Sequence, residues 1–454
     1  MTKPLFEQFK AVSAKQWKQK IQADLKGADY NDTLIWHSNE GINVKPFYHA
    51  DDFEHLPNTS EARASQFKIC QTIFVANVQM SNKKALDAIE RGAESIKFII
   101  PAEDISIEQL LQNITLSSIP IYFELQFLSS DYVKNIPSEN TVILNDIIGR
   151  LTSTGNWFKT LNEDFSKFET IVKQTASFSV DASIYQNAGA NMTQQLAYCL
   201  AHAAEYLQVL DHKLTEAEKA KLEVHFTVAV GSNYFFEIAK LRALRTLWRS
   251  LASEFNVNPK CEIFAIPTKR NKTLYDYNTN MLRTTTECMS AILGAANTVC
   301  NLAYDAIYHK DNEFGERIAR NQLLILKNES YFDKVDNPAD GAYYIETLTT
   351  ELATKALEIF KDIEANGGFL AQLKEGTIQR KSKESAQQEQ QQFDQGKITL
   401  LGSNKHPNPE DRMSDDIELY PFVKTNPVKT LIEPIIAKRL AETIEKERLK
   451  AETE

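Results

Sequence analysis

The feature that most constrains this chain is a regular alternation of short apolar runs and helical periodicity, which begins near residue 70. The runs are apolar throughout rather than alternating, as is typical of parallel strands buried on both faces. Helical periodicity separates them, although it is weak near DYVKNIP (131–137). The runs fall at residues 71–77, 95–100, 120–127, 141–146, 170–180, 223–230, 262–267 and 298–305. Eight strand-then-helix units predict an α/β fold, a closed (β/α)8 TIM barrel, with a doubly wound open sheet as the alternative.

Two extensions flank the predicted barrel of residues 66–380. Residues 1–65 hold a helix pattern (FEQFKAVSAKQWKQKIQADL) and an extended arm (LIWHSNEGINVKPFY). Residues 381–454 begin with a glutamine-rich stretch, which is either an exposed helix or a linker. They end in an amphipathic pattern that predicts a C-terminal helix, docked either on its own barrel or on another subunit. Its apolar positions are Leu431, Ile435, Ile436 and Leu440.

Composition and charge argue against several classes of protein. The 454 residues carry a net charge of −10, and no stretch supplies the basic face of a nucleic-acid binder. No apolar run approaches the roughly 20 residues that a membrane span needs, and the N-terminal segment lacks a signal-peptide core. The five cysteines are scattered without a CxxC pair, which favours small buried apolar residues in a reducing compartment. We therefore expect a cytoplasmic protein that binds neither nucleic acid nor membrane.

The polar residues at the ends of the predicted strands do not form a recognisable catalytic set. The motifs HxH, HExxH, GxGxxG and GxxxxGK[ST] are all absent, so neither a zinc site nor a phosphate-binding loop is expected. His202 lies on an apolar helix face and is expected to be structural. His225 lies inside the sixth run and is the histidine to test, with a structural role still favoured.

Several segments together resemble the methylmalonyl-CoA mutase family. They are collinear from about residue 40 to 404, and together they are specific, although each alone is weak. The segments are EGINVKPFY (40–48), VGSNYFFEIAKLRALRTLW (230–248), DYNTNMLRTTTECMSAILGAANTV (276–299), FGERIARNQLLILKNES (314–330) and DNPADGAYYIETLTTELATKALEIF (336–360). The resemblance implies an isomerase that rearranges an acyl-CoA through adenosylcobalamin radical chemistry. It also implies a barrel that binds CoA along its axis and a separate cobalamin domain with a DxHxxG motif.

The positions that would carry chemistry in that family differ here. The family's SxSGYHxQEAGA reads SVDASIYQNAGA (179–190), so its tyrosine–histidine pair falls on Ser183 and Ile184. Isoleucine cannot donate to a thioester carbonyl, and losing one such donor costs roughly 2–4 kcal/mol of transition-state stabilisation. The family's glutamine in GTIQND becomes Leu144, and the basic residue and serine of RLSFFW become Glu223 and His225. A carboxylate at that basic position would repel an anionic substrate.

The H-x-QTSG segment of the family has likewise become FAIPTKRN (264–271), without its histidine and glycine. The scaffold is kept by contrast, including Gln186, Gly189 and Asn233 around the expected active site. Selective loss of the chemical positions predicts a small (β) subunit with no catalytic residue and no bound cofactor or metal. No DxHxxG motif is present and only residues 403–454 follow Gly402, so we expect no cobalamin-binding domain.

The resemblance then implies a heterodimer with a catalytic large (α) subunit that binds adenosylcobalamin and interconverts (R)-methylmalonyl-CoA and succinyl-CoA. The N-terminal arm would contribute to the subunit contact, and the same surface allows a homodimer of the isolated chain. Two alternatives stay open. One is a substrate-barrel subunit of an acyl-CoA mutase whose cobalamin-binding chain is encoded separately. The other is a free-standing pseudo-enzyme scaffold.

Overall fold

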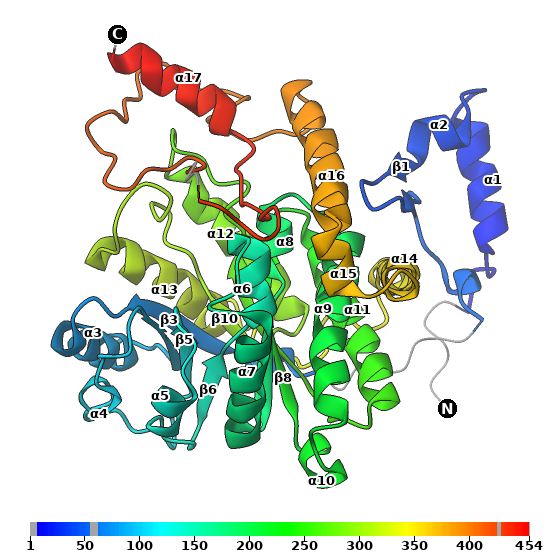
Figure 1. Ribbon diagram of the computed structural model, residues 1–454. Coiled ribbons are helices and arrows are strands. Elements are labelled where there is room, and N and C mark those ends of the chain that lie inside the picture. The colour runs from blue at the N-terminus through cyan, green and yellow to red at the C-terminus, as the bar shows by residue number, and fades with distance from the viewer. Residues whose placement is uncertain (1–6, 55–61, 425–427, 454) are drawn as a thin grey trace.

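The computed structural model describes residues 7–54, 62–424 and 428–453, and a barrel of eight parallel strands forms its centre (Figure 1). The strands are β3 (Lys68–Phe74), β4 (Ser95–Ile100), β5 (Ile121–Leu125), β6 (Thr141–Leu144), β7 (Ser177–Asp181), β8 (Glu223–Val230), β9 (Cys261–Pro267) and β10 (Thr298–Cys300). They follow the order β6-β5-β4-β3-β10-β9-β8-β7. Within the described residues no ladder joins β6 to β7, and the Asp181 N–H instead bridges this seam to the Asp146 carboxylate at 2.7 Å. The predicted TIM barrel is confirmed.

Helices surround the barrel, as Figure 1 shows. They are α3 (Val78–Glu90), α4 (Ile107–Leu110), α5 (Ser130–Lys134), α6 (Ile147–Thr154), α7 (Leu161–Thr175), α8 (Ser183–Asn187), α9 (Met192–Asp211), α10 (Glu216–Lys219), α11 (Tyr234–Glu254), α12 (Thr279–Leu293) and α13 (Glu313–Asn328). The weak helix predicted near residues 131–137 is the short α5. No helix in the described ranges is both long and apolar enough to cross a membrane.

Several polar residues at the strand ends serve as helix N-caps. The Asn77 side chain accepts a hydrogen bond from the Met80 N–H and begins α3. The Asp146 carboxylate accepts from the Gly149 N–H and begins α6. A side chain in this position satisfies one of the unpaired N–H groups of the first helical turn. Some of the polar residues at the strand ends therefore have a structural role as helix caps.

The run at 170–180 was predicted as one strand, but the strand begins only at Ser177. Residues up to Thr175 belong to α7, whose buried face includes Ile171 and Val172. Ala176 ends the helix in the left-handed region, with φ 51°. Only residues 173–176 separate the buried Val172 of the helix from the strand, and the sequence pattern alone merged the two segments.

The prediction of a C-terminal helix was wrong in part, because residues 428–441 form neither helix nor strand and the helix α17 covers only Glu442–Thr453. Leu431 and Ile436 are exposed, whereas Ile435 and Leu440 are buried. Pro434 has no N–H to donate and opposes a helix through this stretch. We call residues 428–441 the C-terminal strap.

Three further helices follow the barrel: α14 (Tyr343–Ala365), α15 (Phe369–Lys374) and α16 (Thr377–Asp394). The sequence left open whether the glutamine-rich stretch is a helix or a linker. It is helical, because it lies in α16. This helix crosses the domain boundary expected at residues 380 and 381.

The N-terminal extension lies beside the barrel as α1 (Ala14–Asp24), α2 (Tyr30–Leu34) and a two-stranded pair, β1 (Trp36–His37) and β2 (Asn43–Val44) (Figure 1). The predicted helix pattern began at Phe6, which lies outside the described residues. None of the residues of α1 is buried. No face of α1 is therefore buried against the rest of the single chain.

Candidate functional site

The tip that follows β7 holds Ser183 and Ile184, where the expected reactive pair is missing. Ser183 is buried at the start of α8, and its N–H and hydroxyl both donate to Asp181 Oδ1, at 3.0 and 2.5 Å. Ile184 is half-buried and packs against the main hydrophobic core. The tip hydroxyl is therefore engaged within its own turn, and Ile184 has no polar side-chain group to offer a substrate.

Asp181 is an unusual carboxyl in this turn. Burial raises its pKa to about 6, and the nearby charges of Asp146 and Glu124 act in the same direction. The hydrogen bonds from Ser183 oppose the rise and only partly offset it. The folded protein therefore holds Asp181 protonated at pH values where an unfolded chain, with a pKa near 3.8, would ionise it.

We predict that Asp181→Asn stabilises the protein at alkaline pH. The folded pKa lies above the unfolded one, so the stability contributed by the aspartate is present below the unfolded pKa and is lost as pH rises through about 6. Asparagine keeps an acceptor for Ser183 without this loss. We expect a gain of about 2 kcal/mol at pH 8 that shrinks toward zero near pH 4, measured by urea unfolding. Exposed Asp104→Asn is the matched control, and a gain independent of pH would contradict the assignment.

His202 is enclosed by a buried network next to the tip. Its Nε2 lies 2.8 Å from Asp146 Oδ1 and its Nδ1 lies 3.0 Å from the Tyr185 hydroxyl. The Tyr206 hydroxyl also donates to Asp146 Oδ1 at 2.6 Å. His202 is fully buried, and both ring nitrogens have partners, so the structural role predicted for it is supported.

The retained Gln186 belongs to a second buried cluster. Its Nε2 donates to Glu237 Oε1 at 3.1 Å, and its Oε1 accepts from the Lys240 ammonium at 2.8 Å. Lys240 lies 2.5 Å from Glu237, and Glu237 also accepts the Gly231 N–H at 2.7 Å. Burial lowers the pKa of Lys240, opposed by the charge of Glu237. Because both ends of its amide are engaged, Gln186 fastens the tip to α11.

The three retained residues Gln186, Gly189 and Asn233 meet at a cavity of about 460 Å³ beside the carboxyl ends of β7, β8 and β9. Arm residues 36–40 and the polar face of α16 form other parts of its wall. Burial raises the pKa of the Glu40 carboxyl in this wall, opposed by hydrogen bonds that include the one from Ser38. Gln186, Gly189 and Asn233 therefore line one cavity, and the two chain extensions form part of its wall.

Leu144 lies elsewhere, in a side-chain cluster that fills the barrel interior. The cluster comprises Cys70, Tyr122, Leu144, Phe264 and Cys300. The Tyr122 hydroxyl lies 2.8 Å from Thr298 Oγ1, and its ring meets the Phe264 ring edge-on at 5.0 Å. Lys97 pairs with Glu124 at 3.0 Å and lies 5.3 Å from the Phe264 ring centre. Side chains from several strands thus occupy the barrel axis.

Glu223 and His225 are not at the tip either. Glu223 is the first residue of β8, at the amino-terminal end of the barrel, and pairs with Lys260 at 3.4 Å. His225 is buried two residues further on, and burial lowers the pKa of its imidazole. The structure separates these two positions from Ser183 and Ile184, which lie beyond the carboxyl end of β7.

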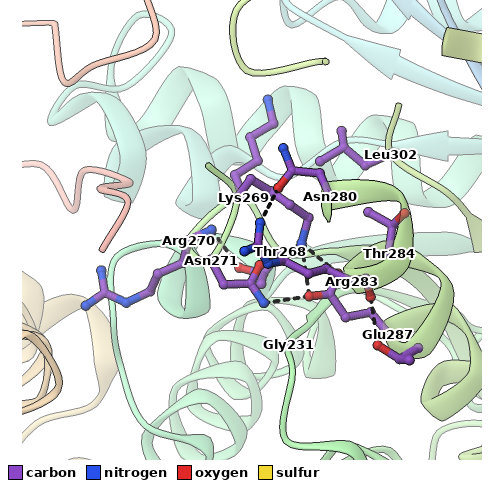
Figure 2. Close-up of polar contacts among 12 residues, drawn as sticks. Gly231, Thr268, Lys269, Arg270, Asn271, Asn280, Arg283, Thr284, Glu287 and Leu302 are labelled. Atoms are coloured by element: carbon purple, nitrogen blue, oxygen red, sulfur yellow. Dashed lines mark hydrogen bonds and ion pairs between the residues drawn. The ribbon is translucent and has the colours of Figure 1, made fainter. Parts of the chain in front are cut away.

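The loop after β9 carries a buried polar network with α12 (Figure 2). The Lys272 ammonium lies 2.7 Å from Glu287 Oε2, and the Asn271 amide donates to Glu287 Oε1 at 2.6 Å. Arg283 donates to Asn280 Oδ1 at 2.7 Å and to the Leu401 carbonyl at 2.7 Å. Sequence reasoning missed this network. The only signal was the RTTTE motif (283–287), because Lys272 comes from a loop that departs from the family pattern.

The C-terminal strap crosses the barrel mouth through backbone hydrogen bonds. Its N–H groups donate to the carbonyls of Gly155, Thr152, Asn187 and Arg270, at distances from 2.8 to 3.2 Å. The Arg270 guanidinium pairs with Glu389 of α16 at 2.5 Å and donates to the Lys438 carbonyl at 2.8 Å. The strap and α16 are thereby fastened to the tip and to the loop after β9.

Comparison with known proteins decides the family. The sequence profile described as methylmalonyl-CoA mutase matches residues 125–446. The methylmalonyl-CoA mutase small subunit of Porphyromonas gingivalis is 34% identical over 99% of this chain and 78% of its own length. The chain belongs to the methylmalonyl-CoA mutase family. Other relatives are the small subunit of Streptomyces virginiae (27% identical, 82% of this chain, 67% of the relative) and the human mitochondrial methylmalonyl-CoA mutase (27% identical, 86% and 60%). A matching solved structure, Yersinia pestis DHPS, has a TM-score of only 0.31 at 12% identity (61% and 100% covered).

Three histidines of this methylmalonyl-CoA mutase family member lie in the barrel or at the cavity, and their surroundings do not fit a cobalt ligand. His202 is sealed between Asp146 and Tyr185, and His225 is buried at the amino-terminal end of the barrel. The arm residue His37 lines the cavity, with its Nδ1 2.7 Å from Asn43 Oδ1. None of the three stands in a DxHxxG motif. No chemical step is therefore assigned to a cobalamin held by these residues.

Proposed function

We propose that the chain is the small, non-catalytic subunit of an adenosylcobalamin-dependent methylmalonyl-CoA mutase. In this proposal it supports a large subunit that binds the cofactor and interconverts (R)-methylmalonyl-CoA and succinyl-CoA, as a cytoplasmic heterodimer. The observation that carries the proposal is the filled barrel axis, where Tyr122, Phe264 and Lys97 occupy space that an extended acyl-CoA would need. The small-subunit names of two relatives support it as well.

The exposed arm supports a partner subunit. Trp17 and Trp36 are each 50% exposed and Phe9 is 68% exposed, while α1 buries none of its residues in the single chain. Exposed apolar side chains concentrated on one segment are typical of an interaction surface. A large subunit covering this arm would remove these side chains from water.

We predict that the purified chain, supplied with adenosylcobalamin and (R)-methylmalonyl-CoA, produces no succinyl-CoA. The physical reason is that Ile184 cannot polarise a thioester carbonyl, and that the side chains of Tyr122 and Phe264 lie inside the barrel where the acyl-CoA would run. Addition of a large subunit with an intact DxHxxG motif should give turnover and a stoichiometric complex by size-exclusion chromatography. Turnover by the chain alone would overturn the proposal.

The alternative of a substrate-binding barrel with a separate cobalamin chain predicts binding of CoA esters. Isothermal calorimetry of the full chain with a CoA ester distinguishes the two, because micromolar affinity would favour this alternative. A free-standing scaffold would copurify without a large subunit from the source organism. We expect no heat when the CoA ester is added to the chain. We also expect a large subunit to copurify with the chain in a stoichiometric amount.

A further inference from the structure

Two of the five cysteines face the same point inside the barrel. Cys70 on β3 and Cys300 on β10 are direct register partners on adjacent parallel strands. Both belong to the interior cluster, so both side chains point inward. Adjacent strands lie about 4.8 Å apart, and disulfides accept Cα separations of roughly 4.4–6.8 Å. The backbone therefore already has a spacing that a bridge between these two residues accepts.

The surroundings of the pair favour a reactive thiolate on Cys300. The hydrogen bond from Cys70 lowers the pKa of Cys300, opposed by burial and assisted by the Lys97 ammonium. Thr72 Oγ1 lies 3.1 Å from Cys300 Sγ and contributes a further hydrogen bond. Burial raises the pKa of Cys70, which stays a thiol. One nucleophilic and one protonated sulfur therefore stand side by side, as thiol oxidation to a disulfide requires.

The other three cysteines provide an internal contrast. Burial raises the pKa of Cys261 to about 12 and also raises the pKa values of Cys199 and Cys288. Thiols that stay protonated react slowly with peroxides. Selective chemistry at Cys300 is therefore expected in a chain whose five cysteines are all buried and free.

We propose that Cys70 and Cys300 form a redox-active dithiol, which hydrogen peroxide oxidises to an intramolecular disulfide. The Cys300 thiolate attacks the peroxide, the O–O bond breaks, and Cys300 becomes a sulfenic acid while the other oxygen leaves and takes up a proton as water. The sulfur of Cys70 then displaces the hydroxyl of the sulfenic acid, which forms the S–S bond and releases a second water. The two thiols lose two electrons and two protons, and one hydrogen peroxide is reduced to two waters. The bond ties β3 to β10 inside the barrel.

The test uses the full chain treated with hydrogen peroxide. Thiols are counted after denaturation, and we expect the count to fall from five to three and to return to five with dithiothreitol. Peptide mapping should join the Cys70 and Cys300 peptides. Cys300→Ser should lose no thiol under the same treatment, whereas Cys288→Ser, the matched control, should still lose two. Cys70→Ser should accumulate a dimedone-reactive sulfenic acid on Cys300.

The result does not depend on the folding of any variant, because dimedone trapping and peptide mapping of the wild-type chain identify the oxidised sulfurs directly. Five persistent thiols, a bridge that involves another cysteine, or oxidation of Cys300 to a sulfinic acid without a bridge would each overturn the proposal. A bridge between Cys70 and Cys300 supports it.

Discussion

Replacing Lys272 by methionine is expected to lower the free energy of unfolding by about 3–5 kcal/mol, a large share of the stability of a typical domain. Lys272 and Glu287 are both buried, and the ammonium lies 2.7 and 2.9 Å from the two carboxylate oxygens. Methionine fills similar space but leaves Glu287 without its counter-ion. Burial already raises the pKa of Glu287 and would then act without the opposing charge of Lys272. Urea unfolding followed by circular dichroism measures the loss.

Two further variants make this test specific. Lys310→Met removes an exposed lysine near the barrel mouth and should change the stability by less than about 0.5 kcal/mol. The double variant Lys272→Met with Glu287→Leu should recover most of the loss, because replacing both members of a buried pair by apolar residues is often close to neutral. If the unfolding free energy of Lys272→Met lies within about 1 kcal/mol of the wild-type value, water reaches Glu287 and the pair is not excluded from solvent.

The barrel could be predicted because strands buried on both faces leave a local signature. Each apolar run between residues 71 and 305 reports its own burial without any knowledge of its neighbours. The C-terminal strap could not be predicted in this way. Its apolar spacing suggested a helix, but its hydrogen bonds go to Gly155, Asn187 and Arg270, which lie far away along the chain. The local sequence of a segment does not show that distant backbone carbonyls will accept its hydrogen bonds.

The candidate site was only partly predictable. Matching motifs gives the order of the residues along the chain, but not the end of the barrel at which each residue lies. Ser183, Ile184 and Gln186 are close in sequence and lie together in α8. Glu223 was predicted to belong to the same site. It is the first residue of the eight-residue strand β8, so about 23 Å of strand separates it from the carboxyl end of β8. The pairing of Lys272 with Glu287 was missed, since the RTTTE motif marks Glu287 but nothing in the local sequence of Lys272 marks it as the partner.

Gly189→Ala is expected to cost about 2–4 kcal/mol of unfolding free energy. Gly189 has φ +93°, where a residue with a Cβ is strained by about 1 kcal/mol. An added Cβ would also lie 2.6 Å from Ala386 Cβ and 2.7 Å from the Arg270 guanidinium. Arg270 cannot easily move aside, because it is paired with Glu389 and bonded to the strap. Such crowding typically costs a further 1–3 kcal/mol or so.

Gly376→Ala separates the two contributions, because Gly376 has φ +76° but open space around its Cα. It should cost about 1 kcal/mol, and the excess cost at Gly189 then measures the close docking of α16 and Arg270 on the tip. That excess would give a packing reason for a glycine at this position of the tip, independent of any chemistry at Ser183 and Ile184. Equal costs at the two glycines would remove the packing explanation, and would favour a direct role of Gly189 toward a ligand in the neighbouring cavity.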